Sequence, residues 1–591
     1  MSKIINQRPD PKDVLPILEW GRHYDTGALL GDGVAAVIVT LMLIPQSLAY
    51  AMLAGLPPQV GLYASMLPLV AYALFGSSRT LAVGPVAIVS LMTATALADI
   101  APAGSDRYLQ AAAALALLSG GMLLLWGVLR LGLLANFLSR PVIAGFITAS
   151  GVLIAVSQLR HIIGVDAAGA DLLQLLPRLL GQLPQAHLPT LCIGAGTVVF
   201  LLWARHQLPD LLPRLGLAPV AAGVLARLGP VVAMIATSLL AWWLQLGERG
   251  VALVGAVPGG LPQIALSAPG DLPWRSLLYP ALLISIIGFV ESVSVGHSLA
   301  ARRGQKIAPD QELVGLGAAN VAAALSGGYP VSGGFARSVV NFDAGARTPA
   351  AGAFTAVGIA LTALFFTPWL AYLPQATLAA TIIVAVLSLV DLSVVRRAWL
   401  FGRSDFSAVS ITILVTLVLG VESGVACGLL VSLGLHLLRT SRPHMAVVGE
   451  LPGTAHYRNV ERHQVLTRPE ILSLRVDESL YFANAGYVED RLLELLAQRP
   501  QVRHVILLCI GVNEIDLSAV EVLEGINSRL LERGITLHLS EVKGPVMDLL
   551  RRTQFLQVLS GQVFLTHHVA VTRLSRRLDE ELHSHVPNWE I

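Results

Sequence analysis

The first 438 residues of this 591-residue chain consist of long apolar stretches separated by short polar ones. About 10% of these residues are charged, against about 24% in residues 439–591 and about 25% in ordinary soluble domains. A membrane-spanning helix needs about 20 mostly apolar residues, and stretches of this kind recur through the first segment. The pattern excludes a purely soluble fold. It predicts a polytopic α-helical membrane domain, residues 27–439, followed by one soluble domain.

Twelve apolar stretches are candidate membrane helices. They are residues 29–53, 56–75, 108–129, 136–157, 187–204, 229–247, 276–299, 311–328, 350–369, 376–395, 405–420 and 423–438. Two more, 86–99 and 334–344, are too short or too broken to span a bilayer. Each follows an extended approach that contains Gly and Pro, SRTLAVGP and GGYPVSGG. Counting both predicts fourteen membrane segments.

The distribution of Lys and Arg supports this count. With fourteen segments both termini lie on one side, and we place that side in the cytosol. Of the 23 Lys and Arg residues in the first 438, 18 then lie on the cytosolic side, as the positive-inside rule requires. The five on the other side are Arg107, Arg160, Arg178, Arg249 and Arg275. Residues 1–26 are polar, lack the layout of a signal peptide, and are expected to form a cytosolic lead-in.

The two broken stretches occupy matching ranks in the chain. They are the third and the tenth of fourteen segments, so each is third in a half of seven. Because seven is odd, two equivalent halves would have opposite orientations in the membrane. Paired broken segments in an inverted repeat indicate the binding site of a secondary transporter. The alternative is that Gly and Pro only kink two packed helices.

A half-helix that starts inside the membrane presents unpaired N–H groups and a partial positive charge. Two such starts in an inverted repeat would aim at one central point and form an anion site made largely of backbone. Pro85 suits the first start, because it lacks an N–H group. Ser332, Gly333 and Gly334 suit the second, because small residues allow a ligand to approach the backbone.

Three polar side chains near these starts could bind an anion. Arg337, in the first turn of the second half-helix, adds charge and hydrogen-bond donors; alternatively it snorkels to the interface or pairs with Asp343. Gln46 and Tyr50 are spaced i,i+4, on one face of the first membrane helix, and can donate hydrogen bonds without adding charge. Alternatively, Gln46 only joins neighbouring helices.

Glu291 lies midway along a long apolar stretch, LLISIIGFVESVSVGHS. Ionisable groups at such depth are costly and are usually functional. Burial favours the neutral form of a carboxyl and a nearby cation favours the charged form, so Glu291 near Arg337 could exchange protons. Proton loading would remove its repulsion of an anion and couple the two movements. The alternative is a structural Glu291–Arg337 pair that holds two helices together.

Two long blocks resemble the sulfate permease (SulP) family of anion transporters. They are IPQSLAYAMLAGLPPQVGLYASMLPLVAYALFGSSRTLAVGPVAIVSLM and DQELVGLGAANVAAALSGGYPVSGGFARSVVNFDAGARTPAAG. The resemblance implies a seven-plus-seven inverted repeat with core and gate subdomains, an elevator-like cycle and a homodimer. It also implies an anionic substrate such as sulfate, bicarbonate, chloride, oxalate or a C4-dicarboxylate.

The resemblance assigns roles to individual residues. The implied anion-binding positions are Gln46, Tyr50, Val86, Ala87, Phe335, Ala336 and Arg337. Glu291 is similar to the acid of proton-coupled members. Many relatives have Ser immediately before the Arg, whereas this chain has Ala336. The substitution keeps the backbone N–H but loses a hydroxyl donor, which argues against strong selectivity for sulfate.

The residues after 439 alternate predicted strands and helices, which indicates a small α/β domain over residues 440–575, with residues 576–591 as a terminal tail. The strands are predicted in SLRVDESLYFAN, VRHVILLCIGVNEID and ITLHLSEV. The helices are predicted in GYVEDRLLELLAQRP, SAVEVLEGINSRLLERG, which ends at Gly534 as a C-cap, and GPVMDLLRRTQFLQVL. The order and the element DLSAVEVL resemble the STAS domain. Ser518 matches the phosphorylated serine of related antagonist domains, so it is a candidate regulatory site. Alternatively, Ser518 or Asp516 is only a helix N-cap.

The remaining features exclude several functions. The three cysteines, Cys192, Cys427 and Cys509, lack metal or redox spacing, and no nucleotide-binding loop or catalytic set is present. We therefore expect no cofactor, no metal, no nucleic-acid partner and no enzymatic activity. The leading prediction is a proton-coupled secondary anion transporter in a bacterial-type inner membrane. The alternatives are an uncoupled anion exchanger or channel, a scaffold that signals through the STAS domain, and a nucleobase carrier.

Overall fold

The computed structural model describes residues 15–133, 140–167, 169, 171–214, 228–263 and 272–584. The chain forms two compact units, Met1–Ser432 and Leu433–Ile591, here called the N-terminal and C-terminal units. Residues 1–14 of the expected lead-in and 585–591 of the expected tail lie outside the described residues, as do residues 136–139 of one predicted membrane segment.

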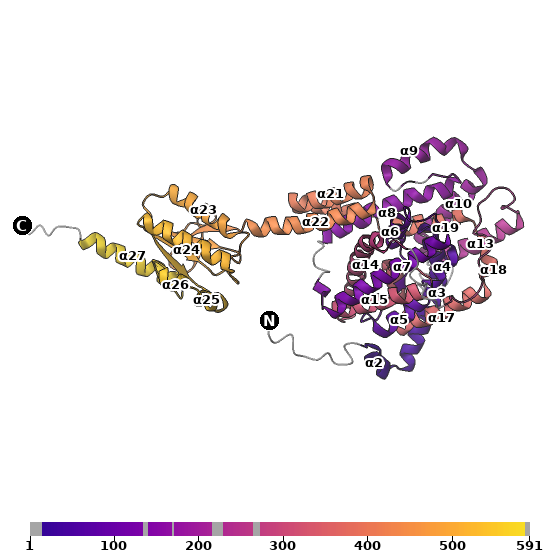
Figure 1. Cartoon of the computed structure of the whole chain (residues 1–591), viewed down its shortest axis with the longest axis horizontal. Helices are drawn as coiled ribbons and strands as arrows, with labels where there is room; N and C mark the ends of the chain where they lie inside the picture. The colour runs from indigo at the N-terminus through magenta and orange to yellow at the C-terminus, as the bar shows by residue number, and fades with distance from the viewer. Residues whose placement is uncertain are drawn as a thin grey trace, which may run out of the picture. The chain divides into compact units, whose positions relative to one another are not determined.

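Helices lie at all fourteen predicted membrane segments (Figure 1). They are α3 (Thr26–Leu53), α4 (Pro58–Tyr63) with α5 (Leu67–Phe75), α6 (Ala87–Leu97), α7 (Asp106–Val128), α8 (Arg140–Ile163), α10 (Leu188–His206), α13 (Gly229–Trp243), α14 (Trp274–Arg302), α15 (Pro309–Leu325), α16 (Phe335–Asp343), α17 (Ala350–Phe365), α19 (Gln375–Leu387), α21 (Arg403–Leu419) and α22 (Val421–Ser441). Among the described residues, seven helices are long and apolar enough to cross a membrane, and four apolar ones are shorter. A helical membrane fold is therefore confirmed, while the count of fourteen crossings stays a prediction.

Three predicted stretches do not form one unbroken helix, although Pro58–Phe75 is one of the seven candidate crossings counted above. The stretch 350–369 holds α17 and the start of a short helix, Thr367–Leu370. The stretch 56–75 is broken between α4 and α5, and Pro68 lies in the first turn of α5, where a missing N–H is tolerated. In the stretch 376–395, the helix α19 stops at Leu387, before the predicted end. Asp391 accepts hydrogen bonds from Ser393 N (2.9 Å) and Oγ (2.5 Å) and so forms a turn before the next helix.

Several short helices lie outside the predicted segments or overlap their ends. They are α2 (Ile17–Trp20), α9 (Leu172–Gln182), α11 (Leu208–Arg214), α18 (Thr367–Leu370) and α20 (Ser393–Phe401), with 3₁₀ turns at Gly21–His23 and Leu183–Gln185.

The C-terminal unit is a six-stranded sheet with helices on both faces. Its strand order is β4-β3-β5-β6-β7-β8, with antiparallel pairing from β4 to β5 and parallel pairing from β5 to β8. The elements are β3 (Met445–Glu450), β4 (Tyr457–Asn459), β5 (Ile471–Val476), α23 (Ala485–Ala497), β6 (His504–Leu508), α24 (Leu517–Glu532), β7 (Thr536–Ser540), α25 (Gly544–Leu550), α26 (Phe555–Val558), β8 (Val563–Phe564) and α27 (His567–Ser584).

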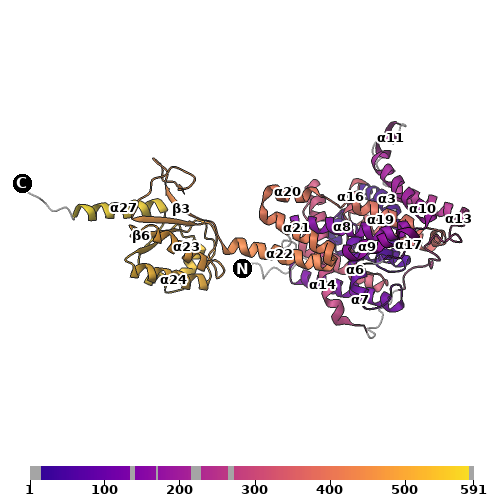
Figure 2. The same cartoon turned by 90° about the horizontal axis from the view of Figure 1, so that it is seen from above.

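Side chains of this sheet alternate between two apolar layers. Leu472 and Val505 pack with α23 and α24 on one face, whereas Ile471 and Ile506 pack with α27 on the other. Figure 2 shows α23 and α24 on one side of the sheet and α27 on the opposite side. The period of two follows from strand geometry. The predicted α/β domain is confirmed, and α27 runs past the proposed domain limit at residue 575.

The predicted elements of this unit were partly correct. The strands β5, β6 and β7 and the helices α23 and α24 lie where the sequence predicts them, and Gly534 adopts φ +72° just after α24. The stretch GPVMDLLRRTQFLQVL is two short helices, α25 and α26, instead of one. The strands β3, β4 and β8 were missed; β4 and β8 are only three and two residues long.

A buried histidine joins α27 to the sheet. His567 is 1% exposed; its Nδ1 lies 2.8 Å from Ser540 Oγ and its Nε2 lies 3.0 Å from Ser473 Oγ. Burial lowers the pKa of His567 to about 4. The unfolded chain, with a histidine pKa near 6.5, therefore binds this proton more tightly than the folded chain does.

Acid should therefore weaken the docking of α27. The contribution of neutral His567 is complete above about pH 7 and falls as the pH drops toward 4, by about 2.5 kcal/mol at pH 4.5. Hydrogen exchange of α27 amides in the full chain, corrected for the intrinsic effect of pH, measures this loss. His567→Gln should lose protection at pH 7 and show a smaller further loss at pH 4.5. An equal further loss in both proteins would contradict the assignment.

Candidate functional site

The two broken segments meet in the N-terminal unit. The strands β1 (Val83–Gly84) and β2 (Ser332–Gly333) pair antiparallel, with Val83 opposite Gly333 and Gly84 opposite Ser332. The helix α6 begins three residues after β1, and α16 begins two residues after β2. The short sheet therefore brings the N-termini of two half-helices together.

Neither half-helix has a side-chain cap. Val86 and Gly334 are the N-cap residues of α6 and α16, both are extended, and neither accepts a hydrogen bond with its side chain. The first-turn N–H groups of a helix have no partner within the helix. The free N–H groups at the start of α6 and at the start of α16 therefore lie close together, and each helix start adds a partial positive charge.

Polar side chains of α16 hold the approach to α6. Ser338 Oγ accepts a hydrogen bond from Ala82 N (2.9 Å), and Asn341 Nδ2 donates one to the carbonyl of Thr80 (3.0 Å). The backbone N–H of Gly334 donates to the carbonyl of Ala82 (3.1 Å). These bonds join the two half-helices into one hydrogen-bonded body.

The approach to α16 is held by three other helices. Asn320 of α15 binds both backbone groups of Val331, at 2.9 Å each. Ser292 of α14 accepts a hydrogen bond from Gly333 N (2.9 Å). The hydroxyls of Tyr329 and Ser90, the latter on α6, lie 3.1 Å apart. Sequence reasoning missed these residues, because a single polar residue in an apolar helix does not show its partner.

A small cavity of about 50 Å³ opens at the two helix starts, with room for a few water molecules or a small anion. All eight predicted transport-site residues line it. The lining residues are Gln46, Tyr50, Pro85, Val86, Ala87, Ile88, Glu291, Gly334, Phe335, Ala336, Arg337, Ala385 and Leu389. The structure thus brings together α3, α6, α14 and α16 with the C-terminal end of α19.

Arg337 is the cation of this cavity and is only 3% exposed. Its Nε donates to the carbonyl of Ala82 (3.3 Å) and its Nη2 to the carbonyl of Pro85 (3.2 Å), while its buried Nη1 has no hydrogen-bond partner. Its burial excludes the alternative that it snorkels to the membrane interface. The two carbonyls orient the guanidinium and leave one N–H edge for a ligand.

Two glycines make room for this guanidinium. A Cβ atom at Gly84, where φ is +154°, would lie 3.2 Å from Arg337 Nη1. A Cβ atom at Gly334 would lie 2.9 Å from Arg337 Nη2. The close approach explains why both half-helix approaches carry glycine here.

The neutral and acidic side chains of the cavity come from α3 and α14. Gln46 and Tyr50 are both 9% exposed and lie on the same face of α3, as their spacing predicts. Glu291 of α14 is half-buried, and its buried Oε2 atom has no hydrogen-bond partner. Unpaired buried polar atoms are costly, so Glu291 Oε2 and Arg337 Nη1 are the two atoms that a ligand or a proton would most stabilise.

Ser518, the candidate regulatory residue, lies at the start of α24 in the C-terminal unit. Asp516 is the N-cap, because its Oδ1 accepts a hydrogen bond from Ala519 N (2.8 Å). Ser518 is exposed in the first turn of that helix. The structure therefore assigns the capping role to Asp516 and leaves the Ser518 hydroxyl on the surface.

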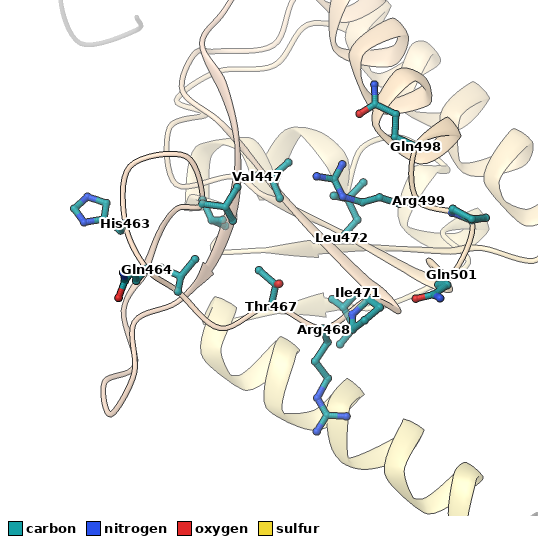
Figure 3. Close-up of a pocket in the computed structure, with 15 residues that line it drawn as sticks. Val447, His463, Gln464, Thr467, Arg468, Ile471, Leu472, Gln498, Arg499 and Gln501 are labelled. Atoms are coloured by element: carbon teal, nitrogen blue, oxygen red, sulfur yellow. The ribbon is translucent and has the colours of Figure 1, made fainter.

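The C-terminal unit also has an open hollow beside β3 and β5 (Figure 3). Its lining includes Val447, Leu472, His463, Arg499 and Arg468, and it contains no acid and no cysteine. Arg468 points from its rim toward α27, where its Nη1 and Nη2 bind Asp579 at 2.7 and 3.0 Å. No acid–base pair is present in this hollow, and no metal-binding group of three His, Cys, Asp or Glu occurs among the described residues.

Two protein families match the sequence. The sulfate permease family matches residues 29–412, and the STAS domain matches residues 462–570. Sulfate transporter 4.1, chloroplastic, of Arabidopsis thaliana is 34% identical over 572 residues, which are 94% of this chain and 82% of the relative. A probable sulfate transporter of Mycobacterium tuberculosis is 35% identical over 559 residues, 94% of this chain and 97% of the relative.

The chain shares its fold with solved structures of other proteins. The murine Solute Carrier 26 family member A9 anion transporter, in its inward-facing state, has a TM-score of 0.84 at 21% identity and covers 97% of both chains. The transmembrane domain of the cyanobacterial bicarbonate transporter BicA has a TM-score of 0.58 at 20% identity, covering 70% of this chain and 99% of that one.

Proposed function

Because the chain belongs to the sulfate permease family, it is an anion transporter and not an enzyme, and we propose that it carries a small oxyanion together with a proton. The observation that carries this proposal is the meeting of two uncapped helix starts with Arg337 Nη1 at one cavity. Each helix start contributes a partial positive charge of about one half. With the guanidinium, these charges favour a divalent oxyanion.

Glu291 supplies the proposed coupling to protons. An ionised Glu291 lowers the positive potential of the cavity and opposes anion entry, whereas a protonated Glu291 does not. Anion and proton therefore enter together and leave together. Gln46 and Tyr50 add neutral donors to the same anion. Ala336 contributes its backbone N–H only, so the site selects by charge and size more than by hydroxyl contacts.

We further propose that the anion crosses by elevator-like alternating access. The hydrogen bonds from α16 to Thr80 and Ala82 support this, because a body cross-linked in this way can move as a unit. We also propose a gate subdomain, a homodimer, a bacterial-type inner membrane and a cytosolic position for both termini. These proposals rest on the family resemblance and the loop charges. The STAS domain would regulate this cycle.

The substrate is proposed to be sulfate or a related anion. Sulfate appears in the names of the curated relatives, and bicarbonate in the name of one structural neighbour. Proteoliposomes loaded at pH 7.5 and given labelled sulfate, bicarbonate, fumarate or succinate, with and without an inward proton gradient, test this. Saturable uptake that rises with the gradient is expected for at least one anion. Uptake of none of them would contradict the proposal.

The same panel separates a coupled transporter from a channel. A channel would pass anion current across a planar bilayer at a reversal potential set by the anion gradient alone. A proton-coupled transporter would shift its reversal potential with the pH difference at constant anion gradient. The second result is expected here.

Regulation at Ser518 is proposed through the exposed first turn of α24. A phosphate there would lie at a favourable helix start and add charge to the surface without breaking the Asp516 cap. Ser518→Asp should change the uptake rate by about twofold or more without loss of folded protein, whereas Ser518→Ala should leave it unchanged. Equal uptake by both variants would remove Ser518 from regulation.

A further inference from the structure

A second acid of the N-terminal unit, Glu312, is completely buried and lies outside the cavity lining. It belongs to the first turn of α15. Its Oε1 accepts three hydrogen bonds, from Ser77 N (2.9 Å), Ser77 Oγ (2.6 Å) and Ser78 N (2.8 Å). Its Oε2 accepts a fourth from Tyr72 Oη (2.8 Å). Both carboxylate oxygens are therefore satisfied.

Glu312 binds the chain at the point where the approach to the cavity begins. Ser77 and Ser78 start the extended segment that continues through Thr80 and Ala82 to β1 and the N-terminus of α6. Successive backbone N–H groups that converge on a carboxylate fix the local backbone direction. From this fixed point, the segment is held by Leu81 N, which donates to Ser78 Oγ (3.2 Å), by the bonds from α16 to Thr80 and Ala82, and by the pairing of β1 with β2.

We propose that Glu312 is a positioning residue for the anion site, a proposal that rests on the proposed function of that site. The carboxylate fixes the start of the approach, and thereby the aim of the α6 N-terminus at the bound anion. A site made largely of backbone donors has few side chains to correct its geometry, so an anchor in the backbone path controls affinity. Glu312 itself does not touch the anion.

The other half-helix has a comparable anchor at its far end. Asp32 of α3 is also completely buried and accepts hydrogen bonds from Arg347 N (2.6 Å), Thr348 N (3.0 Å) and Thr348 Oγ1 (2.5 Å), just beyond α16. Two successive backbone N–H groups again converge on a buried carboxylate. Both half-helices are thus tied to neighbouring helices, α15 and α3, through acids that line no part of the cavity.

The test is Glu312→Gln in the full chain, with Asp310→Asn as the matched control. Asp310 lies in the same helical turn and also accepts a backbone hydrogen bond, from Gly132 N (2.7 Å), but that loop follows α7 and does not lead to the cavity. For labelled sulfate uptake, Glu312→Gln should raise KM about tenfold while the maximal rate per folded protein stays within about twofold. Hydrogen exchange across residues 77–97 should quicken. Asp310→Asn should change neither quantity.

An unchanged KM in Glu312→Gln, or no change in exchange over residues 77–97, would overturn the proposal. If the wild-type chain takes up no sulfate, the exchange result alone decides the role of Glu312, and the lost uptake counts against the proposed function instead. If Glu312→Gln does not fold, Ser77→Ala removes one of the four bonds and should raise KM by about twofold to threefold. An unchanged KM in Ser77→Ala would then overturn the proposal.

Discussion

Replacement of Arg337 with Gln is expected to lower kcat/KM for anion uptake by at least about 100-fold. Arg337 holds the single formal positive charge of the cavity lining, and its unpaired Nη1 is buried there. Loss of one partner of a buried charge pair costs about 3–5 kcal/mol, and each 1.4 kcal/mol is a factor of ten. Initial rates of labelled sulfate uptake into proteoliposomes measure the effect.

Two further variants separate charge from geometry. Arg337→Lys keeps the charge but loses the planar fork that binds the carbonyls of Ala82 and Pro85, so intermediate uptake is expected. Arg303→Gln is the matched control, because Arg303 also binds backbone carbonyls, those of Ala346 and Phe342, but does not line the cavity. Equal losses in Arg303→Gln and Arg337→Gln would show that Arg337 acts only as a structural brace.

Replacement of Glu291 with Gln is expected to uncouple uptake from the proton gradient. Glutamine has the shape of the protonated acid but cannot release a proton, so the site stays permanently in its anion-accepting form. Uptake by the wild-type chain should rise severalfold when an inward gradient is imposed, whereas Glu291→Gln should give the same rate with and without it. The KM for the anion should stay similar or fall, because a repulsive charge is removed.

The control for this result is Glu422, an acid of the N-terminal unit that does not line the cavity. Glu422, in the first turn of α22, accepts a hydrogen bond from Thr95 Oγ1 (3.1 Å). Glu422→Gln should retain the response to the gradient. A full gradient response in Glu291→Gln, together with normal uptake, would assign the proton to a different group.

The candidate site is predictable from sequence because its main signals are local. Gly and Pro near Pro85 and Gly334 mark two broken helices, and a charged residue such as Arg337 or Glu291 is conspicuous in an apolar stretch. Matching rank in the two halves then predicts that these distant segments meet, and β1 and β2 do pair. That contact places Val86, Ala87, Phe335, Ala336 and Arg337 at one cavity. Gln46, Tyr50 and Glu291 reach the same cavity from two other helices, α3 and α14.

The supports of the site could not be predicted, because their partners are far away in the chain. Glu312 lies 235 residues from Ser77, and Asp32 lies 316 residues from Thr348. In the sequence, each of these acids comes soon after a polar loop. It therefore looks like an ordinary residue at the membrane–water interface. Only the fold shows that they are buried and fully hydrogen-bonded.

Helix ends were predicted poorly for a related reason. The break between α4 and α5 and the early end of α19 lie inside apolar stretches, where composition does not change. They are set by Pro68 and by the turn at Asp391, which are weak local signals. Hydropathy therefore locates apolar segments well but does not fix how many of them cross the membrane.

The central claim is that an anion binds between the N-termini of α6 and α16. Its most direct test is a crystal structure of the full chain with selenate, whose selenium gives an anomalous signal and whose shape matches sulfate. We expect one anomalous peak in the cavity, with the selenate oxygens around it within hydrogen-bonding distance of the first-turn N–H groups of both helices and of Arg337 Nη1, and no peak there in Arg337→Gln. A strong peak elsewhere in the N-terminal unit, with this cavity empty at saturating selenate, would contradict the claim.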